Sequence, residues 1–217
     1  FYDATEGSVL VDGVDVKDYT FDALYDRIGY VTQKAVLFAG DVRENVLFGE
    51  SGAAKDEETV RQALRLSMAE EFVEKMDGGE NAQIAQSGSN VSGGQKQRLS
   101  LARALARKPE ILIFDDSFSA LDYKTDACLR DGLARELGET TCLIVAQRIG
   151  TIRHADLIVV LDEGRVAGMG THRELLQNCS VYREIAESQL SPEELEGDMA
   201  YPKAEEAIAD AEGREEA

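Results

Sequence analysis

The 217-residue sequence lacks any apolar run of the roughly 18–20 residues that a helix needs to span a bilayer. Its longest apolar runs, Ile111–Phe114 and Leu157–Leu161, have the length of buried strands. A secretory signal is also missing, because Phe1–Asp3 opens the sequence without an initiator methionine, a basic segment or an apolar core. We therefore expect a fragment that is linked to any membrane only through a partner or through a further part of the protein.

Cysteine and histidine are both scarce. The three cysteines, Cys128, Cys142 and Cys179, are odd in number and do not have the spacing of metal ligands. They are expected to be buried or incidental thiols in a reducing cytosol. The two histidines, His154 and His172, are expected to lie at the surface or at helix ends.

Positive charge is also in short supply, because the formal net charge is −19. Nucleic acid is therefore not expected as a partner, since phosphate binding needs a basic surface. Residues 191–217 hold ten carboxylates against Lys203 and Arg214, which is −8 of the −19. We expect this segment to be an acidic, disordered tail with at most transient helix.

The pattern that is present is an alternation of strands and helices. The expected strands are 111–115, 141–146 and 157–162, and the expected helices between and before them are 92–106 and 123–137. Continuous apolar strands that alternate with helices predict an α/β fold with a parallel sheet covered on both faces. Ligands of such sheets bind at the carboxyl ends of the strands, where Asp115 and Asp116 fall.

The strongest local feature is Ser92–Arg98, which opens the helix at 92–106. A serine hydroxyl, Gly93, Gly94 and the free N–H groups of a helix start make an anion site without basic side chains. The glycines let the backbone approach a phosphate where a Cβ would collide. Taken alone, however, the same residues are explained equally well as an ordinary helix cap.

The order of the neighbouring motifs favours the anion site. From Ser92 to Asp116 the sequence resembles the signature-to-Walker-B run of ATP-binding cassette (ABC) ATPases, and the resemblance extends to about Leu190. The matching segments are Ser92–Arg98, Leu101–Leu105, Pro109 with the strand ending at Asp115-Asp116, the D-loop-like Ser119–Asp122, the Q-loop-like Tyr30–Gln33 with Leu37–Asn45 of exporter-type cassettes, Ala155–Gly164 and Gly170–Leu175.

The resemblance implies ATP and Mg²⁺ as cofactors and gives roles to three positions at the strand ends. Asp115 would hold Mg²⁺ through water, because Mg²⁺ keeps part of its hydration shell. Gln33 would reach the metal and the attacking water, and the loop after it would touch a transmembrane domain. Asp116 and Gln147 would occupy the positions of the catalytic base and the switch residue.

The resemblance also implies residues that act across a dimer. The signature residues would close over the γ-phosphate of ATP held by the opposite cassette, and the D-loop would lie in the dimer seam. The signature residues are Ser92, Gly93, Gly94 and Gln95, and the D-loop residues are Ser119, Ala120, Leu121 and Asp122.

Three departures from the family pattern stand out. No Gly-x-x-x-x-Gly-Lys-Ser/Thr phosphate-binding loop occurs, which we attribute to N-terminal truncation. Asp116 replaces the usual glutamate, and withdrawal of the carboxylate by about 1 Å can cost about 10²-fold in rate. Gln147 replaces the usual histidine and cannot become a cation. Together these departures resemble the degenerate half of a heterodimeric ABC exporter.

We therefore predict a P-loop NTPase-like ABC nucleotide-binding domain over 1–190, with a helical subdomain over about 41–106 and the acidic tail over 191–217. Its expected partners are a second cassette and the transmembrane domains of one exporter, at the cytoplasmic face of the membrane. Its own ATPase site would be impaired, and its signature would serve the partner's site.

Three alternatives remain open: a homodimeric exporter cassette in which Asp116 is a slow base, a non-transport ABC ATPase, and a purely structural cassette without turnover.

Overall fold

The computed structural model describes residues 2–49 and 54–200 of the chain. The chain has two compact units, of which the first runs to Gln147 and the second begins at Arg148. None of the helices in the described ranges is long and apolar enough to cross a bilayer.

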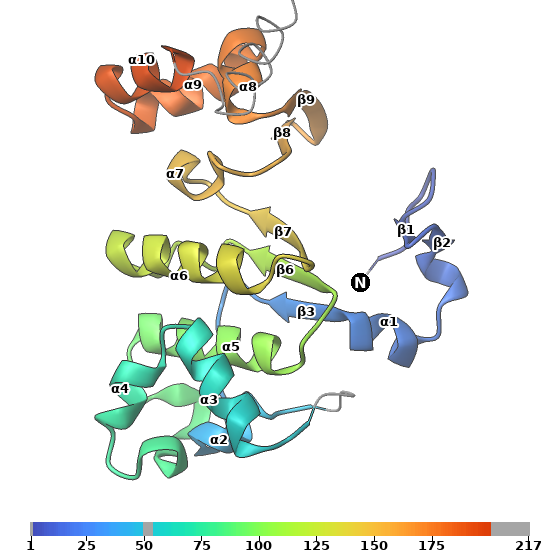
Figure 1. The fold of residues 1–217 in the computed structure, drawn as a ribbon. Coiled ribbons are helices and arrows are strands. Elements are labelled where there is room, and N and C mark those ends of the chain that lie inside the picture. Colours follow the sequence, from blue (N-terminus) through green and yellow to red (C-terminus); the bar gives the residue numbers. More distant parts are fainter. Residues whose placement is uncertain (1, 50–53, 201–217) are drawn as a thin grey trace, which may run out of the picture. The chain divides into compact units, whose positions relative to one another are not determined.

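The first unit has short helices before and between the strands of a parallel sheet (Figure 1). Its elements are β1 Leu10–Val11, β2 Val14–Asp15, η1 Val16–Asp18, α1 Phe21–Arg27, β3 Ile28–Val31, β4 Gly40–Asp41, α2 Val42–Val46, α3 Glu57–Leu66, α4 Glu70–Glu74, η2 Gly79–Asn81, β5 Gln83–Ile84, η3 Gln86–Gly88, α5 Gly93–Ala106, β6 Ile111–Asp115, α6 Tyr123–Glu136 and β7 Thr141–Val145.

The sheet that positions the site has the order β3-β6-β7, and all three strands are parallel. In β6 the side chains of Leu112 and Phe114 are buried, as the strand's apolar sequence predicts. Val31 pairs with Phe114, and Asp115 pairs with Val145. The carboxyl ends of the three strands therefore meet at one edge, and the expected parallel α/β sheet is confirmed.

Helix α5 lies between β3 on one side and α2 and α3 on the other (Figure 1). Strand β3 packs closely against the side chains of Leu112 and Pro109 because residue 29 is a glycine. A Cβ at Gly29 would come within 2.8 Å of both side chains. The expected helical segment 41–106 contains α2 to α5, together with the small antiparallel sheet of β4 and β5. The subdomain boundaries themselves stay a prediction.

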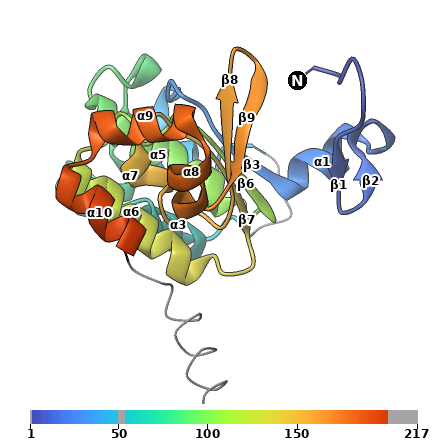
Figure 2. The same cartoon turned by 90° about the horizontal axis from the view of Figure 1, so that it is seen from above.

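The second unit combines an antiparallel hairpin with a group of helices (Figure 2). Its elements are α7 Ile149–Ile152, β8 Ile158–Asp162, β9 Arg165–Gly170, α8 His172–Asn178, α9 Ser180–Gln189 and α10 Pro192–Ala200. The strand expected at 157–162 is β8, and it pairs with β9 in a two-stranded antiparallel sheet. Glu163 and Gly164 make this possible, because their positive φ angles of 47° and 76° suit a two-residue hairpin turn.

The acidic tail differs from the expectation. Residues 192–200 form helix α10 instead of a disordered segment, and the remainder, 201–217, lies outside the described residues. The composition suggested disorder, but Ser191 and Glu194 cap the helix, with the Ser191 N–H donating to Glu194 Oε2 over 2.8 Å. In addition, Leu195 packs against the buried apolar cluster of the second unit.

Candidate functional site at the carboxyl ends of the parallel strands

The candidate site begins where β6 ends. Asp115 is the last residue of β6, and Asp116 follows it with a φ of 45°, in the sparsely populated left-handed region. The Asp116 N–H donates to the carbonyl of Val145 over 3.0 Å, so the turn is held against the end of β7. A non-glycine residue in this conformation carries strain of the kind that clusters at functional sites.

Three residues with predicted catalytic roles meet at one atom. The side-chain amides of Gln33 and Gln147 both donate to Oδ2 of Asp116, each over 3.3 Å. Gln33 lies in the loop after β3, and Gln147 lies two residues after the end of β7. The parallel register therefore brings together three side chains that are 83 and 31 residues apart in sequence.

Asp115 has a separate partner, which the sequence did not reveal. The Tyr30 hydroxyl donates to Oδ2 of Asp115 over 2.8 Å. This hydrogen bond to Asp115 raises the pKa of Tyr30 above its usual value, with burial and the nearby negative charge acting in the same direction. Tyr30 belongs to the Q-loop-like segment, but its role depends on the β3–β6 register, which no local pattern predicts.

Two buried side chains donate hydrogen bonds to the backbone just before Gln33. The side-chain amide of Gln97, a buried residue of α5, donates to the carbonyl of Thr32 over 3.1 Å. The hydroxyl of Ser117, also buried, donates to the carbonyl of Val31 over 3.4 Å. These bonds hold the backbone between Tyr30 and Gln33, and sequence reasoning missed both donors.

The donor set is compatible with Mg²⁺ bound together with a nucleotide. Asp115 supplies a carboxylate and Gln33 an amide oxygen, and both are hard oxygen ligands of the kind that Mg²⁺ prefers. The described residues hold no group of three or more His, Cys, Asp or Glu arranged to bind a metal by themselves. In proteins Mg²⁺ is usually bound by one or two carboxylates together with substrate phosphates and water.

The predicted signature begins α5 as expected. Ser92 caps the helix in a reciprocal capping box, in which the Gln95 N–H donates to Ser92 Oγ over 3.3 Å and the Ser92 N–H donates to Gln95 Oε1 over 2.8 Å. A Cβ added at Gly93 would meet no atom of the chain within 4 Å, whereas one at Gly94 would lie 3.5 Å from the Ala120 carbonyl oxygen. Gly93 is therefore open, and Gly94 lies beside the D-loop-like segment.

The D-loop-like segment 119–122 connects the strand end to α6. The Ser119 hydroxyl donates to the Asp116 carbonyl over 2.8 Å. Asp122 caps α6 by accepting from the Thr125 N–H over 3.0 Å and from the Thr125 hydroxyl over 2.7 Å. The hydrogen bond from the Thr125 backbone lowers the pKa of Asp122. Leu121 is buried in the core, so within this chain the segment has structural contacts at three of its four positions.

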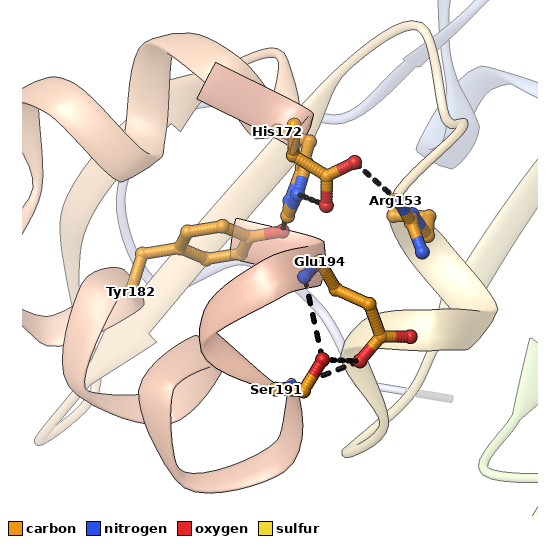
Figure 3. A network of polar contacts seen from close by, with 6 residues as sticks. Arg153, His172, Tyr182, Ser191 and Glu194 are labelled. Carbon is orange, nitrogen blue, oxygen red and sulfur yellow. Dashed lines mark hydrogen bonds and ion pairs between the residues drawn. The ribbon is translucent and has the colours of Figure 1, made fainter. Parts of the chain in front are cut away.

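A second polar cluster lies in the second unit (Figure 3). His172 was expected at the surface or at a helix end; it is the first residue of α8, but its side chain is only 8% exposed. Its Nδ1 lies 2.7 Å from the Tyr182 hydroxyl and its Nε2 lies 3.0 Å from Oδ2 of Asp198, while the other oxygen of Asp198 pairs with Arg153. Burial is the main reason why the pKa of Tyr182 rises to about 12. The imidazole is buried because both ring nitrogens find partners.

The parallel sheet, the paired carboxylates after its central strand and the serine–glycine start of α5 together define an ABC ATPase fold. A family model described as ABC transporter matches residues 1–119. The chain belongs to the ABC transporter family.

Relatives and a solved structure agree with this assignment. An uncharacterized ABC transporter ATP-binding protein of Mycobacterium tuberculosis is 44% identical over 189 residues, which is 87% of this chain and 32% of that protein. A Staphylococcus aureus protein, named for a proposed role as a multidrug export ATP-binding/permease protein, is 40% identical over 185 residues, 85% of this chain and 32% of its own length. The structure of a bacterial Atm1-family ABC exporter with ATP bound aligns with a TM-score of 0.80 and 34% identity, covering 85% of this chain and 32% of the exporter chain. The chain thus spans about a third of the length of these proteins.

Proposed function

We propose that this chain is the ATP-binding and ATP-hydrolysing domain of an ABC exporter, in which dimerisation of two cassettes drives transport. The observation that carries the proposal is the convergence of Gln33 and Gln147 on one carboxylate oxygen of Asp116 at the carboxyl edge of the sheet. The export-related names of the Staphylococcus relative and of the Atm1-family structure support the transport role. The domain would lie at the cytoplasmic face of the membrane, attached to transmembrane domains of the same transporter.

In the proposed site Asp115 and Gln33 would hold the Mg²⁺ of a bound MgATP, and the metal would supply positive charge that offsets the phosphates. Asp116 would accept a proton from the water that attacks the γ-phosphorus, while the bond from that phosphorus to the β–γ bridging oxygen breaks and ADP leaves. The amide of Gln33 would orient that water. Because phosphoryl transfer depends on positioning and charge stabilisation, the placement of these side chains decides the rate.

We further propose that this site is the weak one of two. Asp116 is one methylene shorter than the glutamate usual at this position, and withdrawal of the carboxylate by about 1 Å can cost about 10²-fold in rate. Gln147 is also neutral, so its side chain cannot supply a cation to support charge that develops during the reaction. The partner in this proposal is a different cassette that carries a competent base.

The signature of this chain would serve that partner's nucleotide. A Cβ at Gly93 would meet nothing within 4 Å beyond its chain neighbours and its own helix backbone, so this side of the residue is open to a phosphate held by the opposite cassette. The N–H groups at the start of α5 would favour that anion. The D-loop-like segment beside Gly94 would then lie in the seam between the two cassettes.

A homodimeric exporter with Asp116 as a slow base is the competing function. The hydrogen bond between the Gln33 amide and the Asp116 carboxylate fits the homodimer and the heterodimer equally, so it does not distinguish them. The export-related names of two relatives weigh against a non-transport ABC ATPase.

The test compares single substitutions in the full-length transporter that contains this chain. Gly93→Asp should abolish most ATP turnover, because charges about 4 Å apart at an effective dielectric constant of about 20 repel by about 4 kcal/mol. Each ~1.4 kcal/mol is tenfold in rate. Gly132→Asp is the matched control, because Gly132 is also a helical glycine with no neighbour within 4 Å, and it should retain most turnover.

Asp116→Asn completes the comparison and should leave most turnover intact, because it removes a base that is already poor. Equal and severe losses from Gly93→Asp and Asp116→Asn would show that Asp116 is a working base, and the homodimer would then be the better description. Unchanged turnover in Gly93→Asp would contradict the role of the signature.

A further inference from the structure

The contact between Tyr30 and Asp115 has no role in the reaction proposed above. In the parallel pairing of β3 and β6, Tyr30 lies opposite Ile113, two residues before Asp115. The phenol hydroxyl donates to Oδ2 of Asp115 over 2.8 Å, although 37% of the tyrosine is exposed and its hydroxyl could be solvated by water. The hydroxyl is thus bonded to the carboxylate although part of the residue is accessible to solvent.

The backbone around Tyr30 is well anchored. Val31, the next residue, is completely buried and its carbonyl accepts from Ser117. The carbonyl of Thr32 accepts from Gln97. Strand β3 thus presents Tyr30 from a fixed position, and only two side-chain torsions separate that backbone from the rigid ring that carries the hydroxyl.

We propose that Tyr30 is a positioning residue for Asp115, whose hydroxyl holds Oδ2 so that Oδ1 is the oxygen presented to a hydrated Mg²⁺. The inference rests on the proposed function, because it takes Asp115 as the magnesium carboxylate. The bonded oxygen is fixed in the structure, and it determines the plane of the carboxylate group.

The Asp115 side chain needs a hydrogen-bond partner of this kind for a physical reason. The last torsion of an aspartate is broad, so a carboxylate without a partner samples many orientations. Mg²⁺ demands near-ideal octahedral geometry, and carboxylates that hold metals are themselves usually held by hydrogen bonds. Asp116 receives two amide donors, whereas Asp115 receives the single phenol donor. Loss of the Tyr30 hydroxyl would therefore free Asp115 to rotate.

The experiment measures metal binding directly, with Mn²⁺ as the probe. The full-length transporter is loaded with a non-hydrolysable ATP analogue, the nucleotide site of any non-identical partner cassette is disabled, and free Mn²⁺ is titrated by electron paramagnetic resonance. Tyr30→Phe should weaken Mn²⁺ binding by about tenfold, the lower end of the range for partners of metal ligands. Tyr25→Phe is the matched control, because Tyr25 is an exposed tyrosine of α1, and it should leave the Mn²⁺ affinity unchanged.

Asp115→Asn distinguishes a failure of the role proposed for Tyr30 from a failure of the role proposed for Asp115. If Asp115→Asn weakens Mn²⁺ binding and Tyr30→Phe leaves it unchanged or tightens it, the inference about Tyr30 is overturned while the proposed site stands. If Asp115→Asn has no effect on Mn²⁺ binding, Asp115 is not the metal carboxylate and both proposals fail. Circular dichroism spectra that match the unsubstituted protein are required of all three variants, so a folding defect is recognised as such.

Discussion

Two of the polar clusters among the described residues, one at the end of β6 and one in the second unit, are built differently. At the end of β6, half-buried Asp116 accepts two hydrogen bonds of 3.3 Å on one oxygen, and both donors, Gln33 and Gln147, are exposed. In the second unit, the imidazole of His172 is nearly inaccessible and has partners at 2.7 and 3.0 Å on its two nitrogens. The first cluster has long bonds and accessible groups, and the second has short bonds and satisfied groups.

This difference separates binding chemistry from structural chemistry. A site that must accept phosphates and a metal needs polar groups whose hydrogen-bonding capacity is not exhausted within the chain. A buried cluster that stabilises a fold needs the opposite, because each buried polar atom without a partner costs about 1–3 kcal/mol. We therefore expect substitutions in the first cluster to change the rate of ATP hydrolysis, and substitutions in the second to change the free energy of unfolding.

The largest expected effect is the conversion of the first cluster into a competent one. Asp116→Glu extends the carboxylate, and Gln147→His provides a group that can become a cation. The double variant should raise turnover at this site by about 10²-fold, at the lower end of what a positioned general base contributes. Turnover is measured in the full-length complex with the partner's base disabled and with each single variant as control. An unchanged rate in the double variant would mean that another feature limits the site.

A smaller effect is expected from breaking the second cluster. Asp198→Ala removes the carboxylate that Arg153 and His172 share, and hydrogen bonds to charged groups contribute about 1.5–3 kcal/mol. The opening of α10 should therefore become easier by about 2 kcal/mol, measured by native-state hydrogen exchange of its amides. Glu196→Ala removes the same charge from an exposed position of α10 and should have little effect. Similar exchange rates in both variants would contradict a structural role for the cluster.

The smallest expected effect concerns the cap of the helix that carries His172. Thr171 caps α8 in a reciprocal capping box with Glu174. Thr171→Ala should destabilise the helix by about 1 kcal/mol, and Thr171→Ser should restore most of that loss because serine is an equally good cap. Hydrogen exchange of the α8 amides measures both. Equal exchange in the alanine and serine variants would show that the cap contributes nothing beyond the burial of His172.

Sequence patterns predicted the strands and helices around the first cluster well. The capping residue Ser92, the apolar strand that ends at Asp115 and the helix that follows Asp122 were all readable locally, because caps and apolar runs act within a few residues. The approximate bounds of β6 and α6 were correct for the same reason. The site roles drawn from the family resemblance stay predictions, although the structure brings Gln33, Asp116 and Gln147 together.

The second cluster could not be predicted in this way. The place of His172 at a helix end was foreseen, but its burial was not, because its partners Tyr182 and Asp198 lie 10 and 26 residues away. Residues 192–200 looked disordered because acidic composition hides the few contacts that hold α10, namely Leu195 in the apolar cluster and Asp198 on Arg153. Composition measures an average over a segment, whereas a docked helix depends on one or two particular side chains.

The sequence by itself determined which short segments become strands, capped helices and turns, and where carboxylates and glycines fall along them. The tertiary structure decided which of these groups meet. The register of β3 against β6 brings Tyr30 to Asp115, and β7 brings Gln147 to the oxygen that Gln33 also reaches. The physical reason is that strand pairing joins residues far apart in the chain, and its register depends on the packing of whole faces, such as the close approach that Gly29 permits.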